Sequence, residues 1–262
     1  MLVILATAGI GFNSAHHSLP RYEWVRRTLP DFNAFNDPSE RKQAFISFLA
    51  PQIEIINERI LSQRQRLYGI WQHWQNTGEL PDRDESFLDE LALEYRFTWP
   101  GTPTEADFQA LAERVDTIPV GLAIAQAALE TGWGTSSLAR FENNLYGMLC
   151  YEPGCGKEPT DRPPHLPYYE YATYPSVTAS LRAYVRNLNT NNAYRELRAI
   201  RSEMRGGGMD ATGHALAAGL VLYSDEGELY IVKIRNIIRQ NRLDEADGYL
   251  AGPAAPVLPF PG

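Results

Sequence analysis

One stretch constrains the fold of this chain more than any other: residues 120–129, in which Gln126 is the only polar side chain. A helix that is apolar on every face is a buried helix, so we expect this stretch to form the central helix of the core. Asp116 or Thr117 can cap its start, and Pro119 suits the first turn, where a missing N–H has no consequence.

A glutamate stands in the last turn of this predicted helix. Glu130 shares a helix face with Gln126, and Gly132 follows where helices often end in a left-handed residue. Partial burial and the negative end of the helix dipole both oppose ionisation there and raise the pKa of a carboxyl group. Groups perturbed in this way concentrate at active sites. We interpret Glu130 as a catalytic acid, with a hydrogen-bonded structural acid as the alternative.

The composition limits the class of protein. The 262 residues carry a net charge of −8, whereas a nucleic-acid-binding protein normally has a basic patch, so we expect no nucleic-acid partner. The hydrophobic fraction of 44% is enough for a packed core and too low for a membrane protein. Residues 1–12 are apolar, but a bilayer requires about 20 residues, so we expect no stable membrane span. Residues 1–15 are either a signal peptide or an N-terminal packing segment.

Two cysteines, Cys150 and Cys155, flank the turn signal Pro153-Gly154. A turn brings the two sulfur atoms within bridging distance, so we predict a disulfide and, with it, an oxidising compartment. The alternative is a pair of reduced thiols in a cytosolic loop. The histidines are scattered along the sequence, and two thiols without partners do not make a structural zinc site, so we predict no metal.

Helical hydrophobic periodicity dominates the chain and predicts a mainly α (α+β) fold. A long helical pattern begins at Ser39, which can cap it, and ends before Gly78. Residues 148–175 are rich in proline, glycine and tyrosine, and the runs 145–151 and 168–174 can pair as a small β-hairpin lobe. We divide the chain into a signal segment with an extended lead-in, a helical extension, a main domain and a Pro-rich tail: residues 1–38, 39–116, 117–241 and 242–262.

Familiar catalytic motifs are missing from the sequence. It has no Gly-x-Ser-x-Gly, His-Glu-x-x-His or dinucleotide-binding motif, so serine, zinc and NAD chemistry have no support. What remains is one acid at a helix end beside a lobe rich in tyrosine and asparagine. Aromatic rings and amides suit sugars, and a carboxylic acid with a raised pKa is the group that protonates a glycosidic oxygen. These residues therefore predict a glycoside-cleaving enzyme.

Several short segments carry a family resemblance. The run 125–136 (Ala-Gln-Ala-Ala-Leu-Glu-Thr-Gly-Trp-Gly-Thr-Ser) and the run 143–147 (Asn-Asn-Leu-Tyr-Gly) resemble the catalytic core of the bacterial endo-β-N-acetylglucosaminidases of glycoside hydrolase family 73. The cysteine turn, the run 174–177 and the run 184–189 resemble the Bax-like branch of that family. The resemblance covers residues 40–241.

This resemblance implies a lysozyme-like helical domain with a small β-hairpin lobe and an N-terminal helical extension. It also implies peptidoglycan glycan strands as substrate, no cofactor, and a periplasmic or secreted location in the cell envelope. We expect a monomer. Glu130 would be the general acid that cleaves the strand after N-acetylglucosamine. The alternatives are a lytic transglycosylase or muramidase of the same fold, and a non-catalytic scaffold domain that binds the cell wall.

The resemblance leaves the second catalytic group open. Tyr174 matches the family's tyrosine, and the lobe acid is Glu158 or Glu170, with Asp161 behind them. All three acids lie in polar turn sequence, where a merely solvated carboxylate is the alternative. We favour Glu158 because of its spacing before Tyr174. A third possibility is attack by the substrate's own 2-acetamido group, which Tyr174 would orient.

Further residues are candidates for contact with substrate. Aromatic, amide and acidic side chains near the acid and in the lobe form one set: Trp133, Asn143, Asn144, Tyr146 and Glu170. Arginines after the lobe either meet carboxylates of peptide-substituted glycan or form a solvated face with Glu196 and Glu203: Arg182, Arg186, Arg195, Arg198, Arg201 and Arg205.

Overall fold

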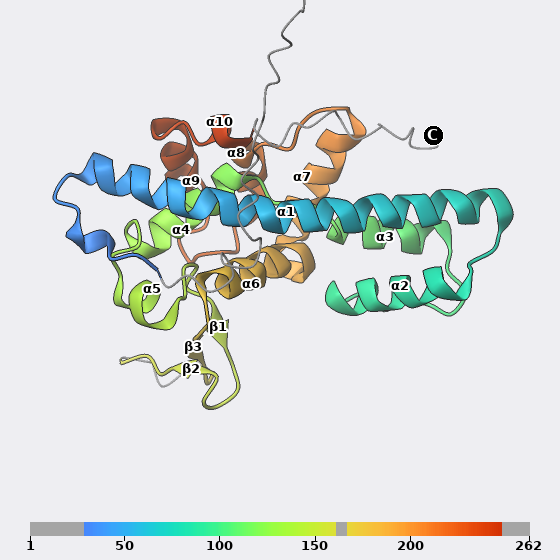
Figure 1. Cartoon of the computed structure of the whole chain (residues 1–262), viewed down its shortest axis with the longest axis horizontal. Coiled ribbons are helices and arrows are strands. Elements are labelled where there is room, and N and C mark those ends of the chain that lie inside the picture. The colour runs from blue at the N-terminus through green and yellow to red at the C-terminus, as the bar shows by residue number, and fades with distance from the viewer. Residues whose placement is uncertain (1–28, 161–166, 248–262) are drawn as a thin grey trace, which may run out of the picture.

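The computed structural model describes residues 29–160 and 167–247, and helices make up most of this part of the chain (Figure 1). The predicted signal segment (residues 1–15), the lead-in up to residue 28, Asp161 and residues 248–262 of the predicted tail lie outside the described residues. The mainly α fold with a small sheet is confirmed. In chain order the elements are η2 (Phe32–Ala34), α1 (Pro38–Thr77), α2 (Asp82–Glu94), α3 (Glu105–Arg114), α4 (Val120–Thr131), α5 (Ser137–Glu142), β1 (Leu149–Cys150), β2 (Gly156–Lys157), β3 (Glu170–Ala172), α6 (Val177–Thr190), η3 (Asn192–Tyr194), α7 (Arg195–Gly206), α8 (Gly213–Leu216), η4 (Ala217–Leu220), α9 (Glu228–Gln240) and α10 (Asp244–Asp247).

The 40-residue helix α1 runs along the long axis of the molecule (Figure 1). The predicted cap, Ser39, is wrong by two positions: the Asp37 carboxylate accepts the N–H of Ser39 at 2.7 Å and caps the helix. Pro38 occupies the first helical position, where its fixed φ and missing N–H are tolerated. Gly78, with φ of +73°, ends the helix where the sequence predicted.

Helices α2 and α3 pack on the C-terminal half of α1 and form the predicted helical extension (Figure 1). Trp71 of α1 stacks on Phe108 of α3 with ring centroids 5.7 Å apart. Tyr95, directly after α2, donates its hydroxyl to Oε1 of Gln63 at 3.0 Å. These contacts attach both shorter helices to α1.

Helix α4 is the central helix that the sequence predicted. Every residue from Val120 to Ala128 is buried, and the helix contacts α1, α8, α9 and α10. The predicted cap by Asp116 or Thr117 is wrong, because no side chain caps this helix. Its start is held instead by Asn57 of α1, whose amide donates to the carbonyl of Ile118 at 2.8 Å and accepts the N–H of the same residue at 3.2 Å.

Asp116 does not cap α4 because it is the centre of a buried ion cluster. Its carboxylate lies 2.6 Å from Nε of Arg205, and 3.5 Å from both Nε of Arg201 and Nη1 of Arg64. Burial raises the pKa of Asp116, but the three guanidinium groups together outweigh burial and hold the pKa below its usual value. Arg201 and Arg205 thus point inward, and the buried Arg198 donates to the backbone carbonyls of Leu188 and Asn191. For these three arginines, both predicted roles, substrate contact and a solvated face, are wrong.

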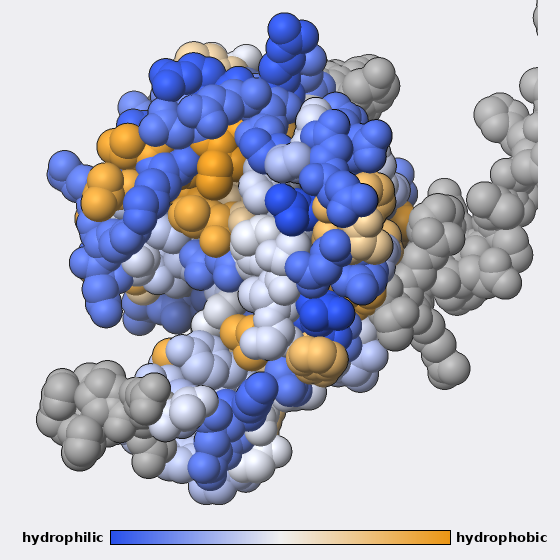
Figure 2. Space-filling model, turned by 90° about the vertical axis from the view of Figure 1, so that its left-hand side faces the viewer, coloured by the Kyte–Doolittle hydropathy of each residue, from blue (hydrophilic) through white to orange (hydrophobic). Residues whose placement is uncertain are grey.

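The lobe is a three-stranded antiparallel sheet in the order β1-β3-β2. Leu149 pairs with Tyr171, as the predicted hairpin requires, and Gly156 of the additional strand pairs with Ala172. The predicted disulfide between Cys150 and Cys155 is present, with the two Cα atoms 6.2 Å apart. The lobe projects below α5 and α6 in Figure 1, and Figure 2 shows a recess between it and the helical body.

One hydrophobic cluster contains residues of both the extension and the main domain, such as Leu67 and Ile124. The predicted division between residues 116 and 117 stays a prediction. Leu243, in the segment assigned to the tail, is buried, and its carbonyl lies against Gly121 of α4. Among the described residues, no helix is both long enough and apolar enough to cross a membrane.

Candidate active site

A tight turn ends α4 and shapes the site. Gly132, Trp133 and Gly134 have φ of +57°, +62° and +80°, a region that L side chains rarely adopt. A Cβ on Gly134 would lie 2.4 Å from Cδ2 of the Phe32 ring, so only glycine fits there. The turn reverses the chain, and the Ser136 side chain caps α5 directly afterwards. The Gly-Trp-Gly sequence therefore fixes the end of the helix that carries the candidate acid.

Glu130 lies in the last turn of α4 with its side chain half-buried. Burial raises the pKa of its carboxyl group. The Tyr230 hydroxyl, which donates to Oε1 at 2.9 Å, lowers it, and the negative charge of Glu226 raises it. Burial is the largest of these effects, so the pKa lies above that of an ordinary glutamate. A carboxyl group with a raised pKa keeps its proton to higher pH, as a general acid must.

A chain of buried hydrogen bonds reaches Glu130 from the core. Tyr184 of α6 donates its hydroxyl to Oε1 of Gln126 at 2.6 Å, and Nε2 of Gln126 donates to the Tyr230 oxygen at 3.0 Å. Tyr230 of α9 then donates to Oε1 of Glu130. The sequence did not predict that either tyrosine belongs to the site. The one sequence feature that could have indicated them is Gln126, the single polar side chain of an otherwise apolar helix, one turn before the acid.

Tyrosine rings surround this chain of hydrogen bonds. Tyr184 stacks on Tyr146 with ring centroids 3.7 Å apart, and Tyr230 stacks on Tyr223 at 5.2 Å. The Tyr223 hydroxyl donates to the backbone carbonyl of Tyr146 at 2.9 Å. Burial raises the pKa of all four phenols, so they stay protonated and act as neutral donors.

The loop 143–147 connects the acid to the lobe. Gly147, with φ of +60°, passes so close that a Cβ there would lie 3.4 Å from Oε2 of Glu130. Asn144 and Tyr146, predicted to contact sugar, are 0% and 2% exposed. Asn144 instead donates to the backbone carbonyls of Met148, directly before β1, and Ala172, the last residue of the central strand β3, at 2.8 and 2.9 Å. Burial therefore favours a supporting role for these two residues beneath the site.

Two other predicted contact residues are partly exposed. Asn143 donates its amide to the backbone carbonyl of Tyr174 at 2.9 Å and so ties α5 to the end of the lobe. The Trp133 ring meets Phe45 edge-on at 5.8 Å, and Nζ of Lys42 lies 5.1 Å from its centroid. Contact of either residue with sugar stays a prediction.

Of the two lobe acids, Glu170 is engaged in the structure of the lobe. Its buried carboxylate accepts the Tyr168 hydroxyl and the backbone N–H groups of Gly154 at 2.8 Å and Gly156 at 2.6 Å. The Tyr168 hydroxyl above all, together with these N–H groups, holds the pKa of Glu170 below its usual value. The carboxylate and the two cysteine sulfurs lie within 4.8 Å of one another, but the sulfurs are bonded to each other and offer no thiolate to a metal.

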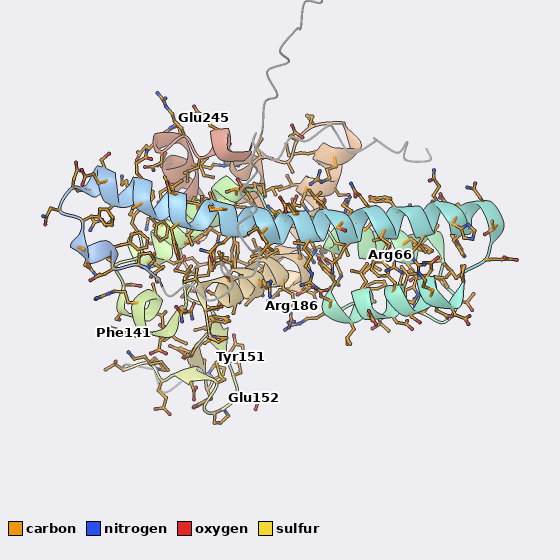
Figure 3. All side chains as sticks on the ribbon, viewed as in Figure 1. Arg66, Phe141, Tyr151, Glu152, Arg186 and Glu245 are labelled. Carbon is orange, nitrogen blue, oxygen red and sulfur yellow. A yellow bond between two sulfur atoms is a disulfide. The ribbon has the colours of Figure 1, made fainter. Side chains whose placement is uncertain are left out.

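Glu158 has different surroundings. It is exposed directly after β2 and makes no hydrogen bond or ion pair with the described residues. Tyr174 is half-buried; burial raises the pKa of its phenol, and Arg186 on α6 lowers it (Figure 3). Within the described part of the chain, no hydrogen bond joins Glu130 to Glu158, Glu170 or Tyr174. The carboxylate of Glu158 is thus free to act on substrate or water, whereas the carboxylate of Glu170 is already used in hydrogen bonds within the lobe.

Comparison with known proteins decides the family. The Glucosaminidase model, described as mannosyl-glycoprotein endo-beta-N-acetylglucosaminidase, matches residues 105–243. This chain belongs to the glucosaminidase family. The protein bax of Escherichia coli (strain K12) is 35% identical over 203 residues, which cover 78% of this chain and 70% of bax. No solved structure gives a significant match.

The match of this glucosaminidase to its family includes α4 with Glu130, the lobe, and α9 with Tyr230. It confirms the resemblance to glycoside hydrolase family 73, and the similarity to bax confirms the branch. The chain is therefore of the glycoside hydrolase class, with a glycan as its substrate. Family membership and the disulfide together favour an extracytoplasmic location.

Proposed function

We propose that this glucosaminidase is an endo-β-N-acetylglucosaminidase that hydrolyses the glycan strands of peptidoglycan, with Glu130 as the general acid. The observation that carries the proposal is the carboxyl group of Glu130. It is half-buried at the end of a buried helix, where burial and Glu226 favour its protonated form. The family match supplies the reaction class. A periplasmic or secreted location, where peptidoglycan is accessible, belongs to the same proposal.

The reaction requires one proton to move to the leaving group. Glu130 donates its proton to the glycosidic oxygen while the bond from that oxygen to the anomeric carbon breaks, and the leaving sugar departs with a free hydroxyl group. Water then adds a hydroxyl group to the anomeric carbon, and the proton that water loses balances the one that Glu130 gave up, so that Glu130 is reprotonated for the next turnover. Cleavage after N-acetylglucosamine gives a reducing N-acetylglucosamine end.

For the second catalytic group, the surroundings of the lobe acids favour Glu158. An attacking water needs a carboxylate with free lone pairs, and Glu158 is exposed and unpaired among the described residues, whereas Glu170 already accepts hydrogen bonds from the lobe. The competing route uses the substrate's 2-acetamido group as the nucleophile, with Tyr174 orienting it. That route needs no protein nucleophile.

The first experiment tests the acid. Glu130→Gln keeps the shape of the side chain and removes the titratable proton, so we expect a loss of at least about 100-fold in kcat on purified peptidoglycan. Glu54→Gln is the matched control, because Glu54 on α1 is another glutamate whose pKa burial raises. Mass spectrometry of the wild-type products should show reducing N-acetylglucosamine ends. Wild-type turnover by Glu130→Gln contradicts the assignment.

The second experiment separates the lobe acids. Glu158→Gln, Glu170→Gln and Glu152→Gln are compared, the last being an exposed carboxylate on the same lobe (Figure 3). We expect Glu158→Gln to lower kcat and Glu152→Gln to leave it unchanged. Near-normal rates in both Glu158→Gln and Glu170→Gln point to the substrate-assisted route. Anhydro-muramyl products identify a transglycosylase instead, and binding of peptidoglycan without any turnover identifies a scaffold.

A further inference from the structure

The hydrogen bonds between Tyr184 and Glu130 run in one direction only. Tyr184 is fully buried, and within the part of the chain that the structure describes its hydroxyl bonds to Gln126 alone. A buried O–H without an acceptor loses its hydration and gains nothing in return, so this hydroxyl must donate to Oε1 of Gln126. The amide of Gln126 is planar, and holding Oε1 toward α6 turns Nε2 toward Tyr230 on α9.

The orientation of this amide determines what Tyr230 does with its proton. The Tyr230 oxygen accepts from Nε2 of Gln126, and its own proton then goes to Oε1 of Glu130, 2.9 Å away. If the amide were reversed, Oε1 of Gln126 would compete for that proton. The Tyr184 hydroxyl would then face an NH₂ group, which only donates. The fully buried Tyr184 hydroxyl therefore opposes the reversed state.

We infer that Tyr184 and Gln126 are positioning residues that lock the Tyr230 hydroxyl as a permanent donor to Oε1 of Glu130 and so confine the transferable proton of the acid to Oε2. This inference rests on the proposed role of Glu130 as general acid. Oε2 is the oxygen beside Gly147, at the base of the lobe. This arrangement of Tyr184, Gln126 and Tyr230, which we call the lock, therefore directs the transferable proton toward the lobe side of the site.

The lock has a measurable consequence for the titration of Glu130. A hydrogen bond from Tyr230 stabilises the carboxylate more than the neutral acid, so its loss favours the protonated form. In Tyr230→Phe, Glu130 should titrate about one pH unit higher than in the wild type, a tenfold change in its acid dissociation constant. In Tyr184→Phe the freed amide samples both orientations, so Glu130 should move in the same direction by a smaller amount.

The experiment is a ¹³C NMR titration of the side-chain carboxyl carbon of Glu130 in the full chain, assigned with Glu130→Gln. The alkaline limb of kcat/KM against pH, measured on peptidoglycan, should move with it. Tyr95→Phe is the matched control, because it removes another hydrogen bond from a buried tyrosine to a glutamine, that to Gln63 in the extension. It should lower stability and leave the titration of Glu130 unchanged.

A Glu130 titration in Tyr184→Phe that stays within about 0.2 pH unit of the wild type, with a clear shift in Tyr230→Phe, overturns the lock. If Tyr184→Phe does not fold, the wild type still decides. The Nε2 protons of Gln126 should show nuclear Overhauser contacts to the Tyr230 ring, and contacts to the Tyr184 ring instead refute the orientation. Activity retained by Glu130→Gln removes the proposed function, whereas the NMR titration tests the lock independently of turnover.

Discussion

Replacing Gly134 by alanine should damage the turn that positions Glu130, through two separable effects. At φ of +80°, an alanine is strained by about 1–2 kcal/mol relative to glycine. Its Cβ would also lie 2.4 Å from Cδ2 of Phe32, whose ring is buried and packs edge-on against Phe45 at 5.3 Å. Forcing a methyl group into such packing adds about 1–3 kcal/mol. We therefore expect Gly134→Ala to lower the free energy of unfolding by about 2–5 kcal/mol.

The matched control is Gly78→Ala. Gly78 has a similar φ of +73°, but a Cβ there would meet nothing within 4 Å. Gly78→Ala should therefore introduce backbone strain without a steric clash and lower the free energy of unfolding by about 1–2 kcal/mol. Urea denaturation of both variants gives the two values as midpoint shifts at constant slope. Gly134→Ala should also lower kcat, because the end of α4 moves. Equal destabilisation by both substitutions would refute the claim that contact with Phe32 shapes the turn.

Three further predictions concern the buried charges and the disulfide. Asp116→Asn should lower the free energy of unfolding by about 3–5 kcal/mol, because Arg201 is 1% exposed and loses its counterion; urea denaturation checks this, with the exposed Asp89→Asn as control. The pKa of Asp116 is lower in the folded protein than in the unfolded chain. The contribution of Asp116 to the free energy of unfolding is therefore present above the unfolded pKa and is lost as pH falls through the folded pKa. Glu130 has the opposite effect on stability, because its pKa is higher in the folded protein: the fold loses stability as pH rises through the folded pKa and Glu130 ionises. Glu130→Gln should therefore melt at a higher temperature than the wild type at neutral pH and at the same temperature in acid. Replacing both cysteines by serine should lower the free energy of unfolding by at most about 2 kcal/mol, since the bridge closes a short loop.

The features that the sequence predicted are those that local chemistry determines. Residues 120–129 are almost wholly apolar, and burial is the only stable outcome for such a helix, so the position of Glu130 at its end followed. The disulfide followed from two cysteines around a Pro-Gly turn. The hairpin pairing followed from two tyrosine-rich runs, although the additional strand Gly156–Lys157 was too short to leave a pattern.

The features that the sequence did not predict depend on partners distant in the chain. Asp116 looked like a helix cap because such caps are read from neighbouring residues, whereas its arginine partners come from α1 and α7. Tyr184 and Tyr230 lie 58 and 104 residues from Gln126, so no local pattern connects them. Each tyrosine alone matched the apolar stripe of its own helix. Their hydroxyl groups gained a role only when three helices came together.

Helix α1 holds the acid-bearing helix at both of its ends. At the start of α4, the Asn57 side chain makes paired hydrogen bonds with the backbone of Ile118. At its end, the Phe45 ring packs against Trp133 in the turn that follows Glu130. Because both contacts come from one 40-residue helix, a shift of α4 along its axis must break one of them. The family match begins at residue 105 and does not include α1, so the smallest unit that keeps Glu130 in place extends upstream of that match.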